Sequence, residues 1–254
     1  MAAFSLVHLV VLLAVLALVV AVIGFGVRGW RRRGLDVTVS VALSGSAVVA
    51  VVSLLMAVGT AISVMTATTV AFTIPVSPFW PAPPAGVTIT DGPTAVAESG
   101  GFTTADVDVS GASAGARLFW ALGQGIGFLV PAAIAALIAI ACFQLLRGAA
   151  FARVVVRASM TTAVVVLVGG VATAVLSQIG GSMVSHELLT VTAVTAATGA
   201  ALADGTTDLG SLLPQPTMSI QVPFWPIGAG LGFAALAAIF RHGARLQHDT
   251  ELLV

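Results

Sequence analysis

Five long apolar runs without a charged residue are the strongest constraint on how this chain can fold. They are Ala2–Val27, Val37–Phe72, Leu118–Leu146, Ala158–Met183 and Leu212–Phe240. A helix rises about 1.5 Å per residue, so each run is long enough to cross a hydrocarbon layer roughly 30 Å thick. The last run is apolar mainly from Val222. The predicted fold class is therefore an all-α membrane protein with five transmembrane helices.

The composition excludes a soluble domain. Charged residues make up 8% of the chain and hydrophobic residues 58%, whereas about 25% of a soluble domain is charged. A charge at the centre of a spanning helix costs roughly 2.5–3.5 kcal/mol, and no Asp, Glu or Arg lies deep inside the five runs. The single cysteine, Cys142, excludes a disulfide within the chain and a metal site built on cysteines.

The arginines predict the orientation of the chain. Nine of the ten lie beside or after the first, third and fifth runs, and Arg117 alone lies in the other set of loops. The acidic residues on the side of Arg117 are Asp91, Glu98, Asp106, Asp108, Glu187, Asp204 and Asp208. Basic residues of short loops stay in the cytoplasm, so we expect the amino terminus outside and the carboxyl terminus inside. Abundant Ala, Val, Gly and Arg without Lys or Tyr indicate a bacterial protein, hence a multi-pass protein of the plasma membrane.

The first run differs from a signal peptide. No basic residue precedes it, it is too long, and Arg28, Arg31, Arg32 and Arg33 follow it. We expect residues 1–34 to form an extra N-terminal helix with a basic cytoplasmic turn. Residues 35–254 are expected to form a four-helix membrane domain with a cytoplasmic tail over 241–254.

Two long outer loops, 73–116 and 184–221, predict a small β-rich cap. In the first loop, VTIT (Val87–Thr90) and FTTADVDVS (Phe102–Ser110) alternate with period two and are separated by turn signals. The second loop contains LLTVTAVT (Leu188–Thr195) and MSIQV (Met218–Val222). Neither loop alone buries a core, so we expect the two loops to pair with each other.

Glycines recur in two similar segments, FWALGQGIGF (Phe119–Phe128) and FWPIGAGLGF (Phe224–Phe233). The likeness fits a tandem duplication, or chance in a chain rich in Ala, Val and Gly. The candidate packing glycines are four apart within each segment: Gly123 with Gly127, and Gly228 with Gly232. Small residues on one helix face let two backbones approach in lipid. The alternative, a thin pore wall, finds only Gln124 as a polar neighbour.

Aromatic residues gather at the predicted outer boundary, namely Phe79, Trp80, Trp120, Phe224 and Trp225. Indole rings favour the headgroup layer, so an aromatic belt is the simplest interpretation. The alternative is a groove for an aromatic ligand or a peptide, framed by the prolines of the two Pro-Phe-Trp-Pro motifs.

The sequence contains no recognisable catalytic motif. There is no Ser-His-Asp set, phosphate-binding loop or pair of membrane carboxylates. A metal site at His186 and Glu187 would need Asp204 and Asp208 to fold onto them. The spans also lack the ionisable residues that ion-coupled transporters keep there. We therefore expect no enzyme activity, no cofactor, no metal and no direct nucleic-acid binding.

Two segments, LLRGAAFARVVVRASM (Leu145–Met160) and FRHGARLQHDTELLV (Phe240–Val254), carry a recognisable pattern. From about Val37 onward the chain resembles the bacterial membrane-protein family known as domain of unknown function 2975. The cytoplasmic loop of that family corresponds here to Arg147, Gly148, Phe151, Arg153 and Arg157. Its carboxyl-terminal pattern corresponds to Gly243, Leu246, Asp249 and Glu251, which stand beside Arg241 and Arg245.

The resemblance implies four spans, which makes the first helix an addition. No activity is established for the family, but its members are often encoded beside a small helix-turn-helix DNA-binding protein. A short amphipathic tail can dock on a partner, or it can pair with the chain's own cytoplasmic loop. We expect a non-enzymatic sensing, regulatory or scaffolding role that links the cap to the loop and tail. The expected partners are membrane lipids and a small cytoplasmic helix-turn-helix regulator or another membrane subunit. The alternative function is a passive channel or carrier for a small apolar solute or lipid.

Overall fold

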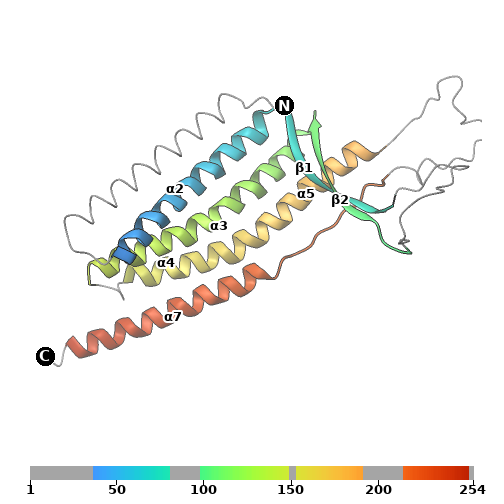
Figure 1. The fold of residues 1–254 in the computed structure, drawn as a ribbon. Coiled ribbons are helices and arrows are strands. Elements are labelled where there is room, and N and C mark those ends of the chain that lie inside the picture. The colour runs from blue at the N-terminus through green and yellow to red at the C-terminus, as the bar shows by residue number, and fades with distance from the viewer. Residues whose placement is uncertain (1–36, 81–97, 149–152, 191–213, 252–254) are drawn as a thin grey trace, which may run out of the picture. The chain divides into compact units, whose positions relative to one another are not determined.

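The computed structural model describes residues 37–80, 98–148, 153–190 and 214–251 (Figure 1). Its elements are α2 (Val37–Thr66), β1 (Thr69–Phe79), β2 (Phe102–Ser110), α3 (Ala114–Leu146), α4 (Arg153–Val164), η1 (Val165–Gly169), α5 (Gly170–Leu189) and α7 (Trp225–Glu251). The turn η1 is π-helical and joins α4 to α5. The predicted first helix lies outside the described residues.

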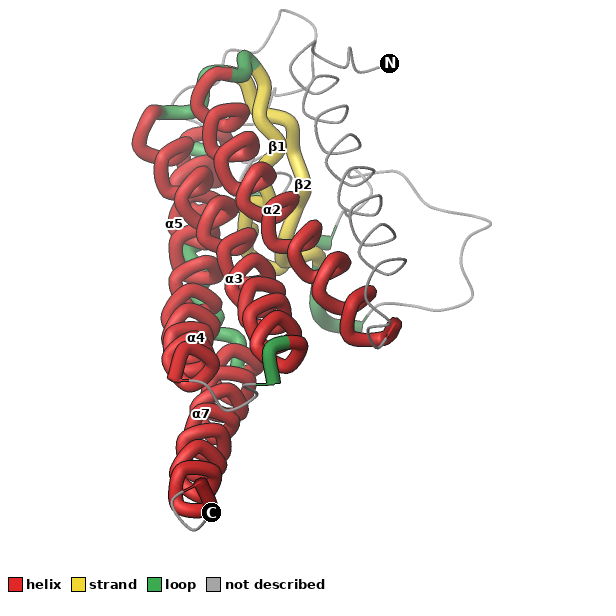
Figure 2. Tube along the Cα trace, turned by 90° about the vertical axis from the view of Figure 1, so that its left-hand side faces the viewer, coloured by secondary structure: helices red, strands yellow, loops and turns green. Residues whose placement is uncertain are grey.

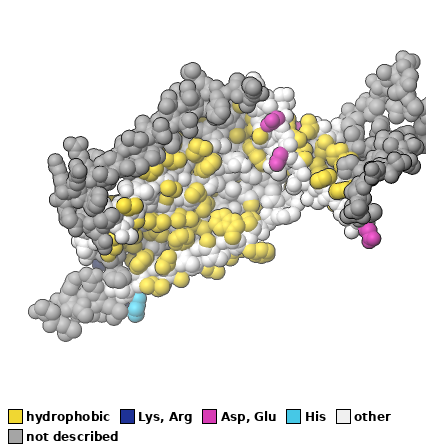
Figure 3. Space-filling model, viewed as in Figure 1, with side chains coloured by type: hydrophobic (Ala, Val, Ile, Leu, Met, Phe, Trp, Pro, Cys, Tyr) yellow, Lys and Arg dark blue, Asp and Glu magenta, His cyan; other side chains and the backbone are white. Residues whose placement is uncertain are grey.

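Four described helical stretches are long and apolar enough to cross a membrane. They are Thr38–Thr66, Ala114–Leu146, Arg153–Leu189 and Trp225–Arg245, and they correspond to the second to fifth predicted runs. Large apolar side chains stay exposed along them, for example Val168 at 59% and Leu231 at 65%. Figure 3 shows such side chains spread over the described helices on the face in view. By length and composition, the chain is a mostly helical, multi-pass membrane protein.

The chain divides into two compact units. The first, here called the helical unit, comprises residues 1–63, 121–175 and 222–254; the second, the sheet unit, comprises 64–120 and 176–221. Within the helical unit, α7 lies against α4 and η1 (Figure 1). Val155 and Val166 are fully buried there, and the Thr162 hydroxyl donates to the Ala133 carbonyl of α3 at 3.4 Å.

The sheet unit contains an antiparallel ribbon of two strands (Figure 2). The register runs from Thr69 opposite Ser110 to Pro75 opposite Thr104, and it becomes irregular between Pro75 and Phe79. Prolines donate no hydrogen bond, so the irregular part falls where Pro75 and Pro78 interrupt β1. Four alternating side chains of β1 form the buried face of the strand: Val70, Phe72, Ile74 and Val76.

One strand predicted for the first outer loop is confirmed. The strand predicted for Phe102–Ser110 is β2, with the same bounds. The predicted second span was wrong at its end, because α2 stops at Thr66 and Thr69–Phe72 belongs to β1. Val70 and Phe72 are apolar because they pack in the sheet unit, where they are 6% and 1% exposed.

The strands expected in the second outer loop are not found in its described part. Leu188 and Leu189 end helix α5 instead of starting a strand, and Met218–Val222 is not a strand. Among the described residues, the two loops are joined by the isolated bridge of Val76 with Pro216 and by the Ser77 amide, which donates to the Gln215 carbonyl at 2.9 Å. Proline at this position cannot extend a ladder of hydrogen bonds. Hydrogen bonds of Ser185 with Pro75 and of Ser113 with Glu187 also join the two loops. The strand predicted over 87–90 and the part 191–195 lie outside the described residues.

Candidate functional site

Arg117, the one arginine on the acidic side, closes the end of α2. Its Nη1 donates to the carbonyls of Ala67 at 2.7 Å and Val64 at 3.4 Å, and its Nη2 donates to Thr68 at 3.4 Å. The last carbonyls of a helix lack partners and carry partial negative charge. The guanidinium supplies both the donors and the charge, so Arg117 has a local structural role.

Ser113 begins α3 and fixes the end of α5 to it. Its hydroxyl accepts a hydrogen bond from the Ala116 amide at 3.2 Å, as an N-cap does. Its own amide donates to the Glu187 carboxylate at 3.0 Å. Glu187 is thus engaged with the backbone. The described residues contain no group of three His, Cys, Asp or Glu that could hold a metal, and Asp204 and Asp208 lie outside them.

Two adjacent glycines of α5 lie against different neighbours: Gly181 contacts strand β1, and Gly180 contacts helix α3. A methyl group at Gly181 would overlap the Thr73 carbonyl oxygen, and one at Gly180 would lie 2.9 Å from the Trp120 amide nitrogen. The buried Ser185 hydroxyl donates to the Pro75 carbonyl at 2.6 Å. Strand and helix therefore meet at backbone distance.

The segment 214–221 is fastened to the same unit by Gln178 of α5. The Gln178 Nε2 donates to the Gln221 carbonyl at 2.7 Å, and the Gln221 amide donates back to Gln178 Oε1. The Ser77 amide holds one end of the segment through Gln215, and the Gln178 side chain holds the other end through Gln221. Helix α7 begins four residues after Gln221, at Trp225.

Helix α7 is seated on η1 through two glycines. A methyl group at Gly230 would lie 2.9 Å from the Leu167 Cβ and 3.2 Å from the Ala163 carbonyl oxygen. On the other helix, one at Gly170 would lie 2.6 Å from the Cβ and Cγ of Pro226. Pro226 stands in the first turn of α7, where a proline costs no helical hydrogen bond. These contacts of Gly230 and Gly170, here called the seat of α7, fix the position of α7 along its axis and its rotation about that axis.

The predicted packing glycines are only partly found in such contacts. Gly123 is buried, and a methyl group at Gly127 would lie 3.2 Å from the Thr173 Cγ2. Among the described residues, nothing lies within 4 Å of a methyl group at Gly228 or Gly232. On α7 the close packing belongs to Gly230, on the opposite face of the helix.

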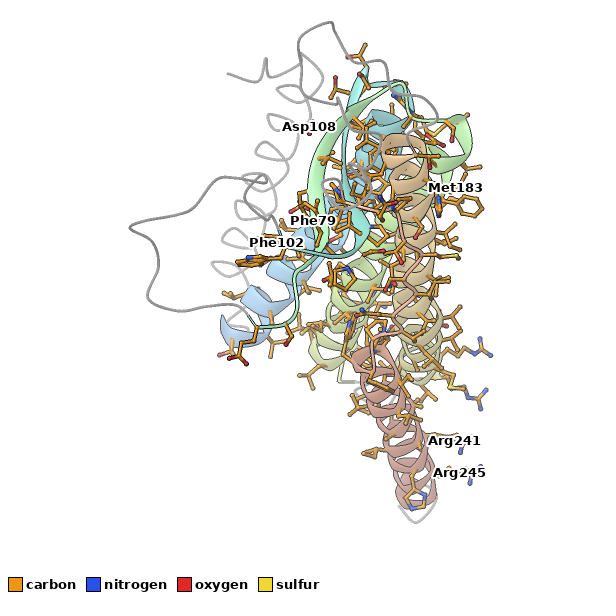
Figure 4. All side chains as sticks on the ribbon, turned by 90° about the vertical axis from the view of Figure 1, so that its right-hand side faces the viewer. Phe79, Phe102, Asp108, Met183, Arg241 and Arg245 are labelled. Carbon is orange, nitrogen blue, oxygen red and sulfur yellow. The ribbon has the colours of Figure 1, made fainter. Side chains whose placement is uncertain are left out.

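The tail continues α7 as a helix to Glu251. Arg241 and Arg245 are exposed and project from the same side of it (Figure 4). Gly243 is half-buried between them. The side chains of Leu246, Asp249 and Glu251 lie outside the described part of the structure.

The predicted cytoplasmic loop is shorter than expected. Gly148 follows α3 with φ of 73°, a left-handed conformation typical of the residue that ends a helix. The Arg147 guanidinium lies 4.2 Å above the Phe143 ring. Arg153 and Arg157 are exposed on α4 and do not belong to a loop. Phe151 lies outside the described residues.

The residues of the predicted aromatic edge are divided between the two units. In the sheet unit, Trp80 stacks on Phe102 with ring centroids 5.5 Å apart, and Trp120 lies 5.2 Å from Phe72. Phe79 pairs with Phe102 across the ribbon (Figure 4). Phe224 and Trp225 belong to the helical unit, and Phe224 is 85% exposed.

Sequence reasoning singled out Arg117 only as an exception among the arginines, and it missed the contacts of Arg117 and Gln178 and the glycines that make the closest contacts. The pair Gly180–Gly181 and the spacing of Gly230 from Gly228 were visible signals, but glycine spacing alone does not tell which face meets a neighbour. The partner of Gln178 is a backbone group 43 residues away, and no local pattern predicts it.

No family model matches the chain, and comparisons with curated proteins and with solved structures find no match. The resemblance described above stays a prediction.

Proposed function

We propose that this chain is a non-enzymatic relay of the bacterial plasma membrane. The sheet unit lies outside and receives a signal, and the basic end of α7 lies in the cytoplasm and meets a partner. In this topology a first helix over 1–34 adds a fifth span, with its amino terminus outside. The partner is a small helix-turn-helix regulator or another membrane subunit.

One observation carries the proposal. The segment 214–221 is bonded to β1 and to α5 in the sheet unit, and the chain then enters α7, one unbroken helix of 27 residues. At about 1.5 Å per residue, that helix is roughly 40 Å long, enough to cross the membrane and extend beyond it. A displacement of the segment is therefore carried along α7 to Arg241 and Arg245.

The arginines support the proposed orientation, with the end of α7 in the cytoplasm. Arg241 and Arg245 end the apolar window Trp225–Arg245, and Arg153 and Arg157 are exposed at the start of α4. Arginines on one side of the spans indicate the cytoplasm. The surface there is basic, which suits an acidic face of a partner or anionic lipid headgroups.

The experiment compares three full-length tagged proteins in the native host: the unchanged chain, a chain lacking residues 241–254, and Gln178→Leu. We expect capture of one specific cytoplasmic or membrane protein by the unchanged chain and its loss on deletion, with membrane insertion retained. Gln178→Leu releases the segment 214–221 far from the tail, so it should change the amount captured at least about threefold. Capture that survives the deletion would overturn the relay.

A second candidate, a passive channel or carrier, is favoured by hydroxyls on α5. Thr173 Oγ1 and Ser177 Oγ are buried one turn apart with no hydrogen-bond partner among the described residues. Buried hydroxyls without partners are sites where water or a small solute binds. Flux of ions or small solutes into liposomes, reduced by Thr173→Val and Ser177→Ala, would select this function.

A further inference from the structure

The irregular turn η1 occupies the middle of the third described span. A π-helical turn bonds i to i+5 and holds one residue more than the α-helix on either side. Its sequence is VVLVG and Gly170 follows it. Valine and glycine are among the weaker helix formers, so the α-helix is weakened at the wide turn. Such turns occur frequently at functional sites.

The wide turn also packs against α7. Leu167 of η1 contacts Gly230, and Gly170, directly after η1, contacts Pro226. On the other side, the Thr162 hydroxyl holds α4 to the Ala133 carbonyl. The helix is therefore fastened before the wide turn, and the seat of α7 lies on the turn itself.

Moving the wide turn along the helix changes this seat at little energetic cost. One set of backbone hydrogen bonds is exchanged for another of equal number, so no polar group is left bare in lipid. If the wide turn moves into α5, the residues it leaves join the α-helix of α4 and rotate by about 100°, the angle of one helical residue. Leu167 then leaves its position under Gly230.

We propose that η1 is the two-state element of this protein, and that the position of the wide turn sets the position of α7. The inference rests on the proposed relay, because a relay requires two arrangements of the helix that carries the signal. Release of segment 214–221 moves the wide turn toward α5, and α7 shifts along its axis. The expected shift is about 5 Å, close to one helical turn, as occurs when packed helices move past each other by one turn in switching.

The test measures the distance between spin labels on α4 and α7. Met160 and Ile239 are 54% and 61% exposed, and both are changed to Cys in a Cys142→Ala background. Four proteins are compared: the unchanged chain, Gln178→Leu, a chain lacking Val168, and the chain that combines the two changes. Removing Val168, which is 59% exposed, closes the wide turn to a regular α-turn. Val168→Ala is the matched control, because it keeps the residue count and thus the wide turn.

We expect Gln178→Leu to move the distance distribution by up to about 5 Å in the chain with the wide turn, and in Val168→Ala. In the chain lacking Val168 the same change should leave the distribution in place. Equal shifts with and without Val168, or no shift in either, would overturn the inference.

Hydrogen exchange gives a second reading that needs no deletion. Gln178→Leu should raise amide exchange at Val165–Gly170 about tenfold or more, while the amides of α3 stay unchanged. Unchanged exchange at η1 would contradict the proposal. Neither reading uses a partner, so a shift of α7 without partner capture refutes the relay alone. Capture that responds to Gln178→Leu without a shift refutes the role of η1 alone.

Discussion

Both units have close contacts at glycines, Gly230 and Gly170 in the helical unit and Gly180 and Gly181 in the sheet unit. The units differ in their side-chain hydrogen bonds between segments, which are more frequent in the described part of the sheet unit. Arg117, Ser185 and Gln178 each bond to carbonyls of another segment in the sheet unit. The hydroxyls of Ser44 and Ser159 in the helical unit bond four residues back in their own helices. In the described helical unit, Thr162 bonds to the Ala133 carbonyl of another helix, so the two units differ in how much they rely on such bonds.

The difference follows from the backbone each unit must satisfy. A spanning helix bonds its own amides and carbonyls, so its neighbours need only fit closely. In the sheet unit α2 ends, α3 begins and the strands have edges, and these positions leave carbonyls and amides without helical partners. Side chains with donors supply what the helices supply for themselves.

The largest effect should come from Gly181→Leu. Its side chain would meet the Thr73 carbonyl and separate β1 from α5, lowering the free energy of unfolding by about 3 kcal/mol. Thermal unfolding in detergent measures the loss. Gly59→Leu is the control, because no described atom lies within 4 Å of that position. An equal loss in both would show that bulk alone decides.

Arg117→Met should cause the second-largest loss in the free energy of unfolding, because it removes the donors at the end of α2 while keeping much of the apolar stem. Hydrogen bonds from a charged group contribute about 1.5–3 kcal/mol each at most, and Arg117 is partly exposed, so we expect a loss of about 2 kcal/mol in denaturant titration. Arg117→Lys keeps the charge and should lose less than half as much. A neutral Arg117→Met would contradict a structural role.

A pair of variants tests the glycine contacts of α7. Gly230→Ala places a methyl group against Leu167 and should destabilise the protein by about 1–2 kcal/mol. Gly228→Ala, on the open face, should stabilise it by up to about 1 kcal/mol, since alanine favours the helix. Melting temperatures measured side by side decide. Shifts of the same sign would remove the distinction between the two faces.

The smallest effect concerns Ser113→Ala, which removes the N-cap of α3 and should cost about 1 kcal/mol. Ser113→Thr keeps the hydroxyl and should stay within a few tenths of a kcal/mol of the unchanged protein. Thermal unfolding of the two variants provides the comparison. If they unfold alike, the bond to Ala116 contributes nothing measurable.

The spans and one strand could be predicted from the sequence because each depends on local pattern. Length and the absence of charge identify a spanning helix, and the alternation in Phe102–Ser110 identifies β2. The start of β1 was missed because Val70 and Phe72 are as apolar as the span before them, so composition marks no boundary there. On α7, Gly228 was predicted to make the close helix contact, but Gly230 makes it. The cause is similar, since both faces of α7 contain small residues.

The contacts that define the site could not be predicted, since they join segments far apart. Arg117 was recognised as an exception among the arginines, but its partners lie about fifty residues earlier. No charged residue, proline or capping side chain at Val165–Gly169 predicts the wide turn. Tertiary packing determines such features, and a single sequence does not record it.

The hydrogen bond from Ser185 to Pro75 joins residues 110 positions apart. During synthesis, strand β1 therefore leaves the ribosome well before the helix that covers it. At about 5–20 residues per second, the ribosome needs roughly 5–20 s to deliver α5 after β1. Through that interval the apolar row of β1 has no helix to cover it, although β2 can already pair with it. A chain arrested before Gly181 therefore presents a bare strand surface of the kind that invites wrong pairing, and quality-control proteases can recognise the unfinished product by it.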